Sequence, residues 1–174
     1  MTRRVTLLWH NERPIGICVF CAPAAALRLR RRFFSLGSQG GITTPLGAGA
    51  GGTGRGLQRS LALKKLNQQL WVLSRVVLHP TYRGAGVAAA FVRQCCASCN
   101  VPWIETLSAM GHLNPFFEKA GFQRVGVIRK DGRGLSARSY ARMYGGRGRV
   151  TEQTVRKSRY AEPVYYVFDN RANC

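Results

Sequence analysis

The chain has 174 residues, 45% of them hydrophobic, which is long enough and apolar enough for one folded domain. This composition excludes a disordered chain, and no apolar run reaches the length of a transmembrane helix. Lysine and arginine total 27 against 7 acidic residues, a net charge of +20. Such an excess of positive charge favours nucleic acid as a partner over an anionic membrane. The alternative without a functional meaning is a codon bias towards arginine. No apolar signal segment follows the charged start MTRRV, so we expect a cytoplasmic protein.

Two apolar runs near the start, Val5–Trp9 and Ile15–Phe20, predict a β-hairpin. The segment 24–34 combines arginines with two phenylalanines. Basic residues beside aromatic rings suit contact with phosphate and base, whereas a basic helix that faces solvent is the alternative. We predict nucleic-acid contacts from Arg30, Arg31 and Arg32.

The six cysteines include two Cys-x-x-Cys pairs, Cys18 with Cys21 and Cys96 with Cys99. Two such pairs resemble a four-thiolate zinc site. On a strand, however, residues three apart point to opposite faces, which is poor geometry for chelation by the first pair. We therefore predict core packing and no metal site.

Residues 37–56 hold nine glycines and no acid, which predicts a flexible loop. The stretch 59–70 that follows has leucines at helical spacing and leads into the next apolar run.

A near-continuous apolar run from Trp71 to Leu78 predicts a central strand covered on both faces. A His-Pro pair ends the run, because proline cannot donate a hydrogen bond to a β-ladder. The glycine-rich segment 82–88 then opens a predicted helix that extends to about Ser98. Free backbone N–H groups at the positive end of a helix bind anions, so this turn predicts a phosphate cradle.

A second strand is predicted over 101–107, followed by a short helix over 116–120. We expect Asn114 as the N-cap of that helix, Pro115 as its first residue and Gly121 as its end.

The last two predicted strands, 125–128 and 163–168, flank a strongly basic segment. Residues 129–160 carry ten basic and two acidic side chains, with three tyrosines interleaved. This segment is the predicted nucleic-acid surface, and a solvated loop is the alternative. The contacts are expected from Arg133, Arg138, Arg142, Arg147 and Arg149.

Two motifs resemble the GNAT acyltransferases. Arg83-x-x-Gly86-x-Ala88 matches their pyrophosphate loop, and the segment FEKAGF at 117–122 is similar to their Y-E-K-x-G-F segment. The resemblance implies an α/β (α+β) fold in which helices flank a mixed central sheet. A single domain would span 1–174, with a shortened N-terminus and the glycine-rich segment as an insertion that replaces the missing N-terminal wall.

The resemblance also implies acetyl-CoA, or another acyl-CoA, as the cofactor. The central strand is expected to pair with the pantetheine arm, and the loop to hold the pyrophosphate. The implied cofactor-binding residues are Val76, Val77, Leu78, Arg83, Gly84, Ala85, Gly86, Val87 and Ala88.

The position of the family's catalytic tyrosine holds Phe117, which cannot protonate a thiolate. The candidate replacements are Ser108 after the second strand, Asp131 beside the basic segment, and Tyr140 as a proton donor or stacking ring. Asp131 is alternatively the first residue of an Asp-Gly turn. Glu105 is either a further candidate or a residue that bonds a neighbouring strand.

Three features resemble the Mom-like branch of phage proteins, which have a GNAT-like fold. They are the shortened N-terminus, Phe117 and the motif H-P-x-Y-R-G-x-G. These proteins convert adenine in DNA to N6-carbamoylmethyladenine and so hide phage DNA from restriction nucleases. The resemblance implies Arg83, Ser108 and Asp131 as site residues, double-stranded DNA as partner, no membrane, and the host cytoplasm if the protein is phage-encoded. The alternatives are a conventional GNAT N-acetyltransferase that acts on a protein or small amine, and a non-catalytic nucleic-acid-binding module.

Overall fold

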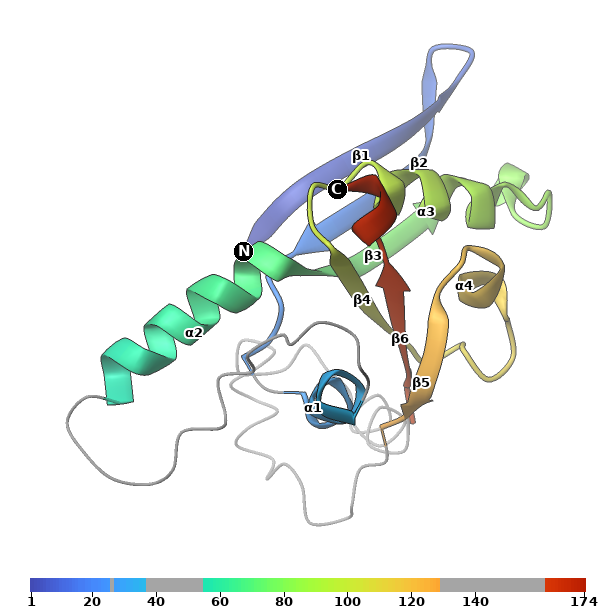
Figure 1. Cartoon of the computed structure of the whole chain (residues 1–174). Coiled ribbons are helices and arrows are strands. Elements are labelled where there is room, and N and C mark those ends of the chain that lie inside the picture. Colours follow the sequence, from blue (N-terminus) through green and yellow to red (C-terminus); the bar gives the residue numbers. More distant parts are fainter. Residues whose placement is uncertain (26, 37–54, 129–161) are drawn as a thin grey trace, which may run out of the picture.

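A computed structural model describes residues 1–25, 27–36, 55–128 and 162–174. In these ranges six strands form one mixed sheet in the order β1-β2-β3-β4-β6-β5 (Figure 1). The strands are β1 (Thr2–His10), β2 (Arg13–Cys21), β3 (Leu70–Leu78), β4 (Trp103–Ser108), β5 (Gln123–Val127) and β6 (Val164–Asp169). The helices are α1 (Arg28–Leu36), α2 (Arg55–Gln69), α3 (Val87–Ala97) and α4 (Phe116–Lys119), with short 3-10 turns η1 (Pro80–Tyr82) and η2 (Arg171–Asn173).

The mixed sheet flanked by helices confirms the predicted fold class. Each strand expected from the apolar runs is present, with ends that differ by a few residues. The expected start of α4 is wrong in detail: the N-cap is Pro115 rather than Asn114, and no side chain caps the helix. Gly121 follows the helix with φ 96°, a left-handed conformation that favours glycine and ends the helix as predicted.

The two faces of the sheet carry separate hydrophobic clusters, because successive strand residues alternate between faces. Helices α3 and α4 cover one face, where Phe91, Val92 and Phe117 pack with Ile104 and Tyr166. Helices α1 and α2 pack on the opposite face, where the cluster consists of Phe34, Leu66, Leu70, Trp103, Tyr165 and Val167. Figure 1 shows α1 below the sheet, away from α3. No helix in the described part of the chain is long and apolar enough to cross a membrane.

Strands β3 and β4 are the only parallel neighbours in this sheet, and they pair over a short distance. Their register runs from Leu70 opposite Trp103 to Val72 opposite Glu105 and then stops, although both strands continue. A β-bulge at Ser74 interrupts the pairing of β3 with β2 just beyond this point. Because a bulge bends its strand, it accounts for the separation of β3 from β4. We call the unpaired region between 73–78 and 106–108 the strand opening.

The prediction that β3 is covered on both faces holds only for its first half. Leu70 and Leu73 are buried in opposite clusters. In the second half of β3, Arg75 is exposed and the side chain of Val77 is 43% exposed to solvent. One face of the strand is therefore uncovered next to the strand opening.

Candidate functional site

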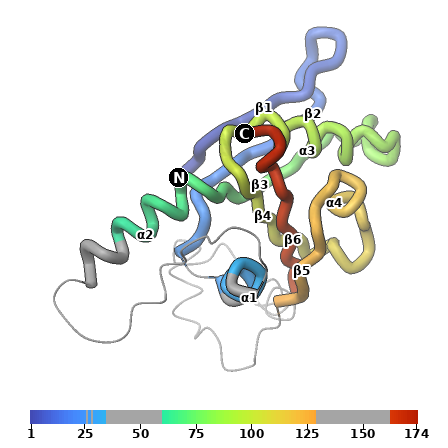
Figure 2. The backbone as a smooth tube through the Cα atoms, viewed as in Figure 1, coloured from blue at the N-terminus to red at the C-terminus, as the bar shows by residue number. Residues whose placement is uncertain are grey.

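The glycine-rich turn between β3 and α3 has the geometry of an anion cradle. Figure 2 follows the chain from β3 through this turn into α3. Gly84 and Gly86 have φ 85° and 78°, and Gly86 is the N-cap of α3, with no side chain bonded to the first N–H groups of the helix. A Cβ added at either glycine would meet nothing within 4 Å, so the space above the turn is open. Unbonded N–H groups, a positive helix end and open space fit a phosphate group.

Arg83 ties this turn to the end of β3 instead of extending from it. Its Nε donates to the carbonyl of Leu78 at 3.2 Å, and its backbone N–H donates to Pro80 at 3.1 Å. These bonds hold the exposed Arg83 against the end of β3, and its contact with the cofactor stays a prediction, as does the cradle formed by the backbone of 84–88.

The strand opening begins directly beside this cradle, because β3 leads into it. Thr106 marks the apex: its buried Oγ1 donates to the carbonyl of Leu73 at 2.9 Å, just beyond the last paired residues. Past the apex, β3 carries Val77 and β4 carries Leu107, which are 43% and 47% exposed. The predicted arm-binding residues 76–78 lie on this stretch of β3. Unpaired strand edges that carry apolar side chains suit an extended, amide-containing arm.

Of the three predicted catalytic residues, the structure describes one. Ser108 is the last residue of β4 and is half-buried, opposite Val164 of β6. Asp131 and Tyr140 lie outside the described residues. The structure therefore places Ser108 at the open end of β4, two residues beyond Thr106, and leaves the other two as predictions.

A tyrosine that the sequence reasoning missed, Tyr166, lies beside Phe117. The rings of Tyr166 and Phe117 are 5.4 Å apart. The Tyr166 hydroxyl donates to Gly111 O at 3.2 Å or to Glu118 Oε1 at 3.1 Å. Burial, followed by the bond to Glu118, raises the pKa of Tyr166, which keeps its proton at neutral pH. The sequence shows only two adjacent tyrosines in an apolar strand, so the partnership becomes visible only in the fold.

Glu118 is itself unusual, because its second carboxylate oxygen, Oε2, is buried and has no hydrogen-bond partner among the described residues. A buried carboxylate oxygen left without a donor is costly and often marks a functional position. Tyr166 and Glu118 thus form a polar pair between α4 and β6, within the cluster that contains Phe117.

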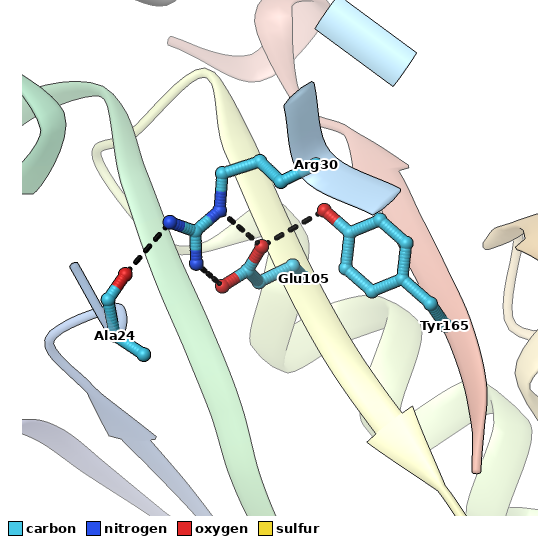
Figure 3. Close-up of polar contacts among 4 residues, drawn as sticks. All are labelled: Ala24, Arg30, Glu105 and Tyr165. Atoms are coloured by element: carbon cyan, nitrogen blue, oxygen red, sulfur yellow. Dashed lines mark hydrogen bonds and ion pairs between the residues drawn. The ribbon is translucent and has the colours of Figure 1, made fainter. Parts of the chain in front are cut away.

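Glu105 is not a free base but part of a buried ion pair. Figure 3 shows its carboxylate clamped by the Arg30 guanidinium: Arg30 Nε donates at 2.9 Å, and Nη2 donates to the second oxygen. The Tyr165 hydroxyl donates to the same carboxylate at 2.8 Å, and Arg30 Nη1 donates to Ala24 O at 2.7 Å. Burial, then the charge of Glu105, raises the pKa of Tyr165. Glu105 was predicted to be either a catalytic candidate or a residue that bonds a neighbouring strand. The structure shows it bonded to neighbouring elements.

The same contacts correct the prediction for Arg30, which is 1% exposed and cannot reach a nucleic acid. A charged side chain in helix α1 is buried because a carboxylate on the sheet below it neutralises the charge. Its neighbours Arg31 and Arg32 are exposed on α1, so their side chains are accessible to a nucleic acid and their predicted contact stays a prediction. The other five predicted nucleic-acid contacts, all within 129–161, lie outside the described residues.

The cysteines mostly pack in the core, as predicted. Cys18, Cys96 and Cys99 are buried in the cluster under α3, whereas Cys21 is half-buried and its Sγ lies 3.2 Å from Ser74 Oγ. Burial raises the pKa of the Cys99 thiol to about 11, so this thiol stays protonated.

Comparison with solved structures finds acetyltransferases. One is an aminoglycoside acetyltransferase in complex with coenzyme A and kanamycin, with 17% identity, 97% of this chain and 67% of that chain covered, and a TM-score of 0.44. A second is a polyamine N-acetyltransferase from Drosophila melanogaster, with 11% identity, 95% and 74% coverage and a TM-score of 0.45. A third is an agmatine N-acetyltransferase, with 12% identity, 95% and 75% coverage and a TM-score of 0.47.

At these identities and TM-scores the similarities assign no activity to this chain. This chain covers 67% and 65% of two structures of the aminoglycoside enzyme, about two thirds of their length. No protein-family profile and no curated protein sequence matches the chain. The function is therefore argued below from the site itself.

Proposed function

We propose that this protein is an acyl-CoA-dependent acyltransferase. The observation that carries the proposal is the strand opening between β3 and β4 directly beside an uncapped, glycine-lined start of α3. The cradle offers N–H groups and open space to a pyrophosphate, and the opening offers unpaired strand edges to a pantetheine arm. When bound, acyl-CoA supplies an activated thioester.

The chain's own groups have three tasks in such a reaction. Backbone N–H groups of 84–88 hold the anionic end, and the open edge of β3 near Val76 and Val77 orients the reacting carbonyl by hydrogen bonds. Ser108, at the end of β4, is the described candidate for the transfer of a proton to the departing thiolate. Tyr166 packs against Phe117 and would hold either the turn after β4, by donating to the Gly111 carbonyl, or α4, by donating to Glu118.

The acceptor that we propose is adenine in double-stranded DNA, the base that the Mom-like proteins modify. Attack of its N6 amino group on the thioester carbonyl would form an N6-acyl bond, break the carbon–sulfur bond and release coenzyme A, whose thiolate takes up the proton that N6 loses. The net charge of +20 supports a polyanionic acceptor, and Arg31 and Arg32 are exposed on α1. A stacked base is inaccessible, so the enzyme would have to flip the adenine out of the duplex. Asp131 and Tyr140 remain candidates for the proton transfers and the stacking contact.

A conventional N-acetyltransferase that acts on a protein or small amine is the second candidate. The observation that favours it is the burial of Arg30, which removes one predicted phosphate contact from α1. Both candidates use the same cradle and strand opening and differ only in the acceptor.

Two measurements test the proposal in sequence. Calorimetric titration with acetyl-CoA should give binding, and absence of binding by folded protein contradicts the acyltransferase. Mass spectrometry of nucleosides from a plasmid co-expressed with the gene then identifies the acceptor. A new adenine adduct supports DNA modification. Unmodified DNA together with acetylation of an offered amine assigns the second candidate, and DNA binding without acyl-CoA binding assigns a non-catalytic module.

The basic segment has its own test in the salt dependence of DNA binding. If about six of its basic residues touch phosphate, log affinity should fall with log salt at a slope of roughly −5. Replacement of Arg138 and Arg142 by Ala should flatten that slope by about two units, whatever the DNA sequence. Replacement of Arg31 and Arg32 by Ala tests α1 as the alternative DNA surface. An effect of that pair alone would move the DNA surface to α1.

A further inference from the structure

A second open site adjoins the cradle on its other side. A cleft of about 730 Å³ lies between the tip of the β1–β2 hairpin and η1, the turn that precedes the glycine loop. Six of its lining residues have polar side chains, namely His10, Asn11, Arg13, His79, Thr81 and Tyr82. None of these residues has a role in the acyltransferase site described above.

The backbone holds the two walls of the cleft together. The hairpin turn is Asn11-Glu12, with φ 46° and 62°, and it places His10 opposite Arg13. A bulge at Ile15 follows, and the Ile15 carbonyl accepts a hydrogen bond from the His79 N–H at 2.7 Å. Glutamate in a left-handed turn is unfavourable, and such strain persists where the surroundings fix the conformation. The cleft is therefore a built feature of the hairpin.

The chemistry of the lining selects an anion. Arg13 contributes a permanent positive charge, two imidazoles and two hydroxyls contribute donors, and no carboxylate is among the residues that line the cleft. His10 Nδ1 lies 2.8 Å from the Tyr82 hydroxyl, which fixes the imidazole ring. The Tyr82 ring makes edge contacts with the rings of His10 and His79, at centroid distances of 5.5 and 6.0 Å. Within the described residues no ion pair involves Arg13, so its guanidinium is available to a ligand.

The position of the cleft indicates which anion it takes. In the sheet β3 lies between β2 and β4, so the strand opening lies on one side of β3 and the hairpin cleft on the other. The glycine loop connects them, because it follows η1 directly and leads into α3. A ligand whose arm enters the opening and whose pyrophosphate lies on the loop would extend its nucleotide end towards the cleft.

We infer that the hairpin cleft binds the 3′-phosphomonoester of the coenzyme A nucleotide, with Arg13, His10 and His79 as donors and Tyr82 positioning His10. This inference rests on the proposed acyl-CoA-dependent function. A phosphomonoester has three terminal oxygens and close to two negative charges, which matches several converging donors and an arginine. A phosphodiester of a nucleic acid has fewer free oxygens and would leave one of the donors unused.

The test compares coenzyme A with dephospho-coenzyme A, which lacks only the 3′-phosphate, by calorimetric titration of the full chain. The wild type should bind coenzyme A about tenfold more tightly, the usual scale of a charge-assisted contact. Arg13→Gln should remove most of this preference and change the affinity for dephospho-coenzyme A by less than about twofold. His79→Gln should act in the same direction, and Tyr82→Phe should give a smaller loss because only the orientation of His10 is affected.

Arg3→Gln is the matched control, because Arg3 is an exposed arginine at the other end of the same hairpin. It should leave the preference unchanged, which separates a local contact from a general loss of positive charge. Equal affinity of the wild type for both ligands overturns the inference and leaves the acyltransferase proposal intact. The inference is also overturned if Arg13→Gln and Arg3→Gln lose the preference for coenzyme A over dephospho-coenzyme A to the same extent. No binding of either ligand overturns both proposals together.

Discussion

The two ends of the β3–β4 pair differ in nearly every physical respect. At the paired end, residues 70–72 are bonded to 103–105, and the Glu105 carboxylate accepts bonds from Arg30 and Tyr165. At the open end, neither strand has a strand partner across the opening, Val77 and Leu107 are exposed, and two glycines adopt left-handed φ. The paired end satisfies its polar groups internally, whereas the open end leaves them for a ligand. The comparison indicates that backbone pairing and the Arg30–Glu105 ion pair hold the two strands together up to the point where they separate.

The largest expected effect comes from breaking the paired end. Glu105→Ala should lower the free energy of unfolding by about 3–5 kcal/mol, because it leaves the buried Arg30 charge without a partner. Chemical denaturation followed by circular dichroism measures the change. The double variant Arg30→Met with Glu105→Leu should recover much of this loss, since an apolar pair needs no neutralisation. A loss below about 1 kcal/mol in Glu105→Ala would show that the ion pair is not formed in solution.

The second largest expected effect is a loss of acetyl-CoA affinity caused by a substitution at the open end. Gly86→Val should weaken acetyl-CoA binding by at least about tenfold, because the side chain would fill the space above the cradle and distort a left-handed residue. Gly121→Ala is the control for a strained glycine away from the cradle, since Gly121 also has a positive φ but lies beyond α4, where an added Cβ would lie 3.3 Å from the Phe168 ring. Both variants should lose stability by about 1 kcal/mol or more, and only Gly86→Val should lose affinity. Undiminished affinity in folded Gly86→Val would contradict the phosphate cradle.

The two ends also differ in how far the sequence predicts them. The elements of the open end follow from local signals: an apolar run, a His-Pro stop and a glycine turn before a helix specify β3, the loop and α3 without knowledge of the rest. Local chemistry also predicted the end of α4 at Gly121. These features depend on backbone rules that act within a few residues of the chain.

The paired end could not be predicted in the same way, because its contacts join residues far apart in the sequence. Arg30 and Glu105 are 75 positions apart, and only the packing of α1 on the sheet brings them together. An arginine among arginines in a basic helix gives no local sign that it is buried. The hairpin cleft was missed for the same reason, since His10 and Tyr82 are 72 positions apart.

The smallest expected effect lies at the boundary between the two ends. Thr106 Oγ1 donates to the Leu73 carbonyl, and both residues are buried at the apex of the strand opening. Thr106→Val keeps the shape of the side chain but leaves that carbonyl unpaired, which should cost about 1 kcal/mol of unfolding free energy. Thr106→Ser retains the hydroxyl and removes one methyl group, so its loss should be smaller.

Ligand binding decides whether this hydrogen bond belongs to the paired end or to the open end. If it only closes the paired end, Thr106→Val should lower stability and leave acetyl-CoA affinity within about twofold of the wild type. This is the expected outcome, because the cradle lies at the opposite end of the strand opening, beyond Leu78. Titration calorimetry and denaturation of the same three proteins give both quantities. A fall in affinity larger than the fall in stability would place the apex within the binding site and would extend the open end by one residue pair.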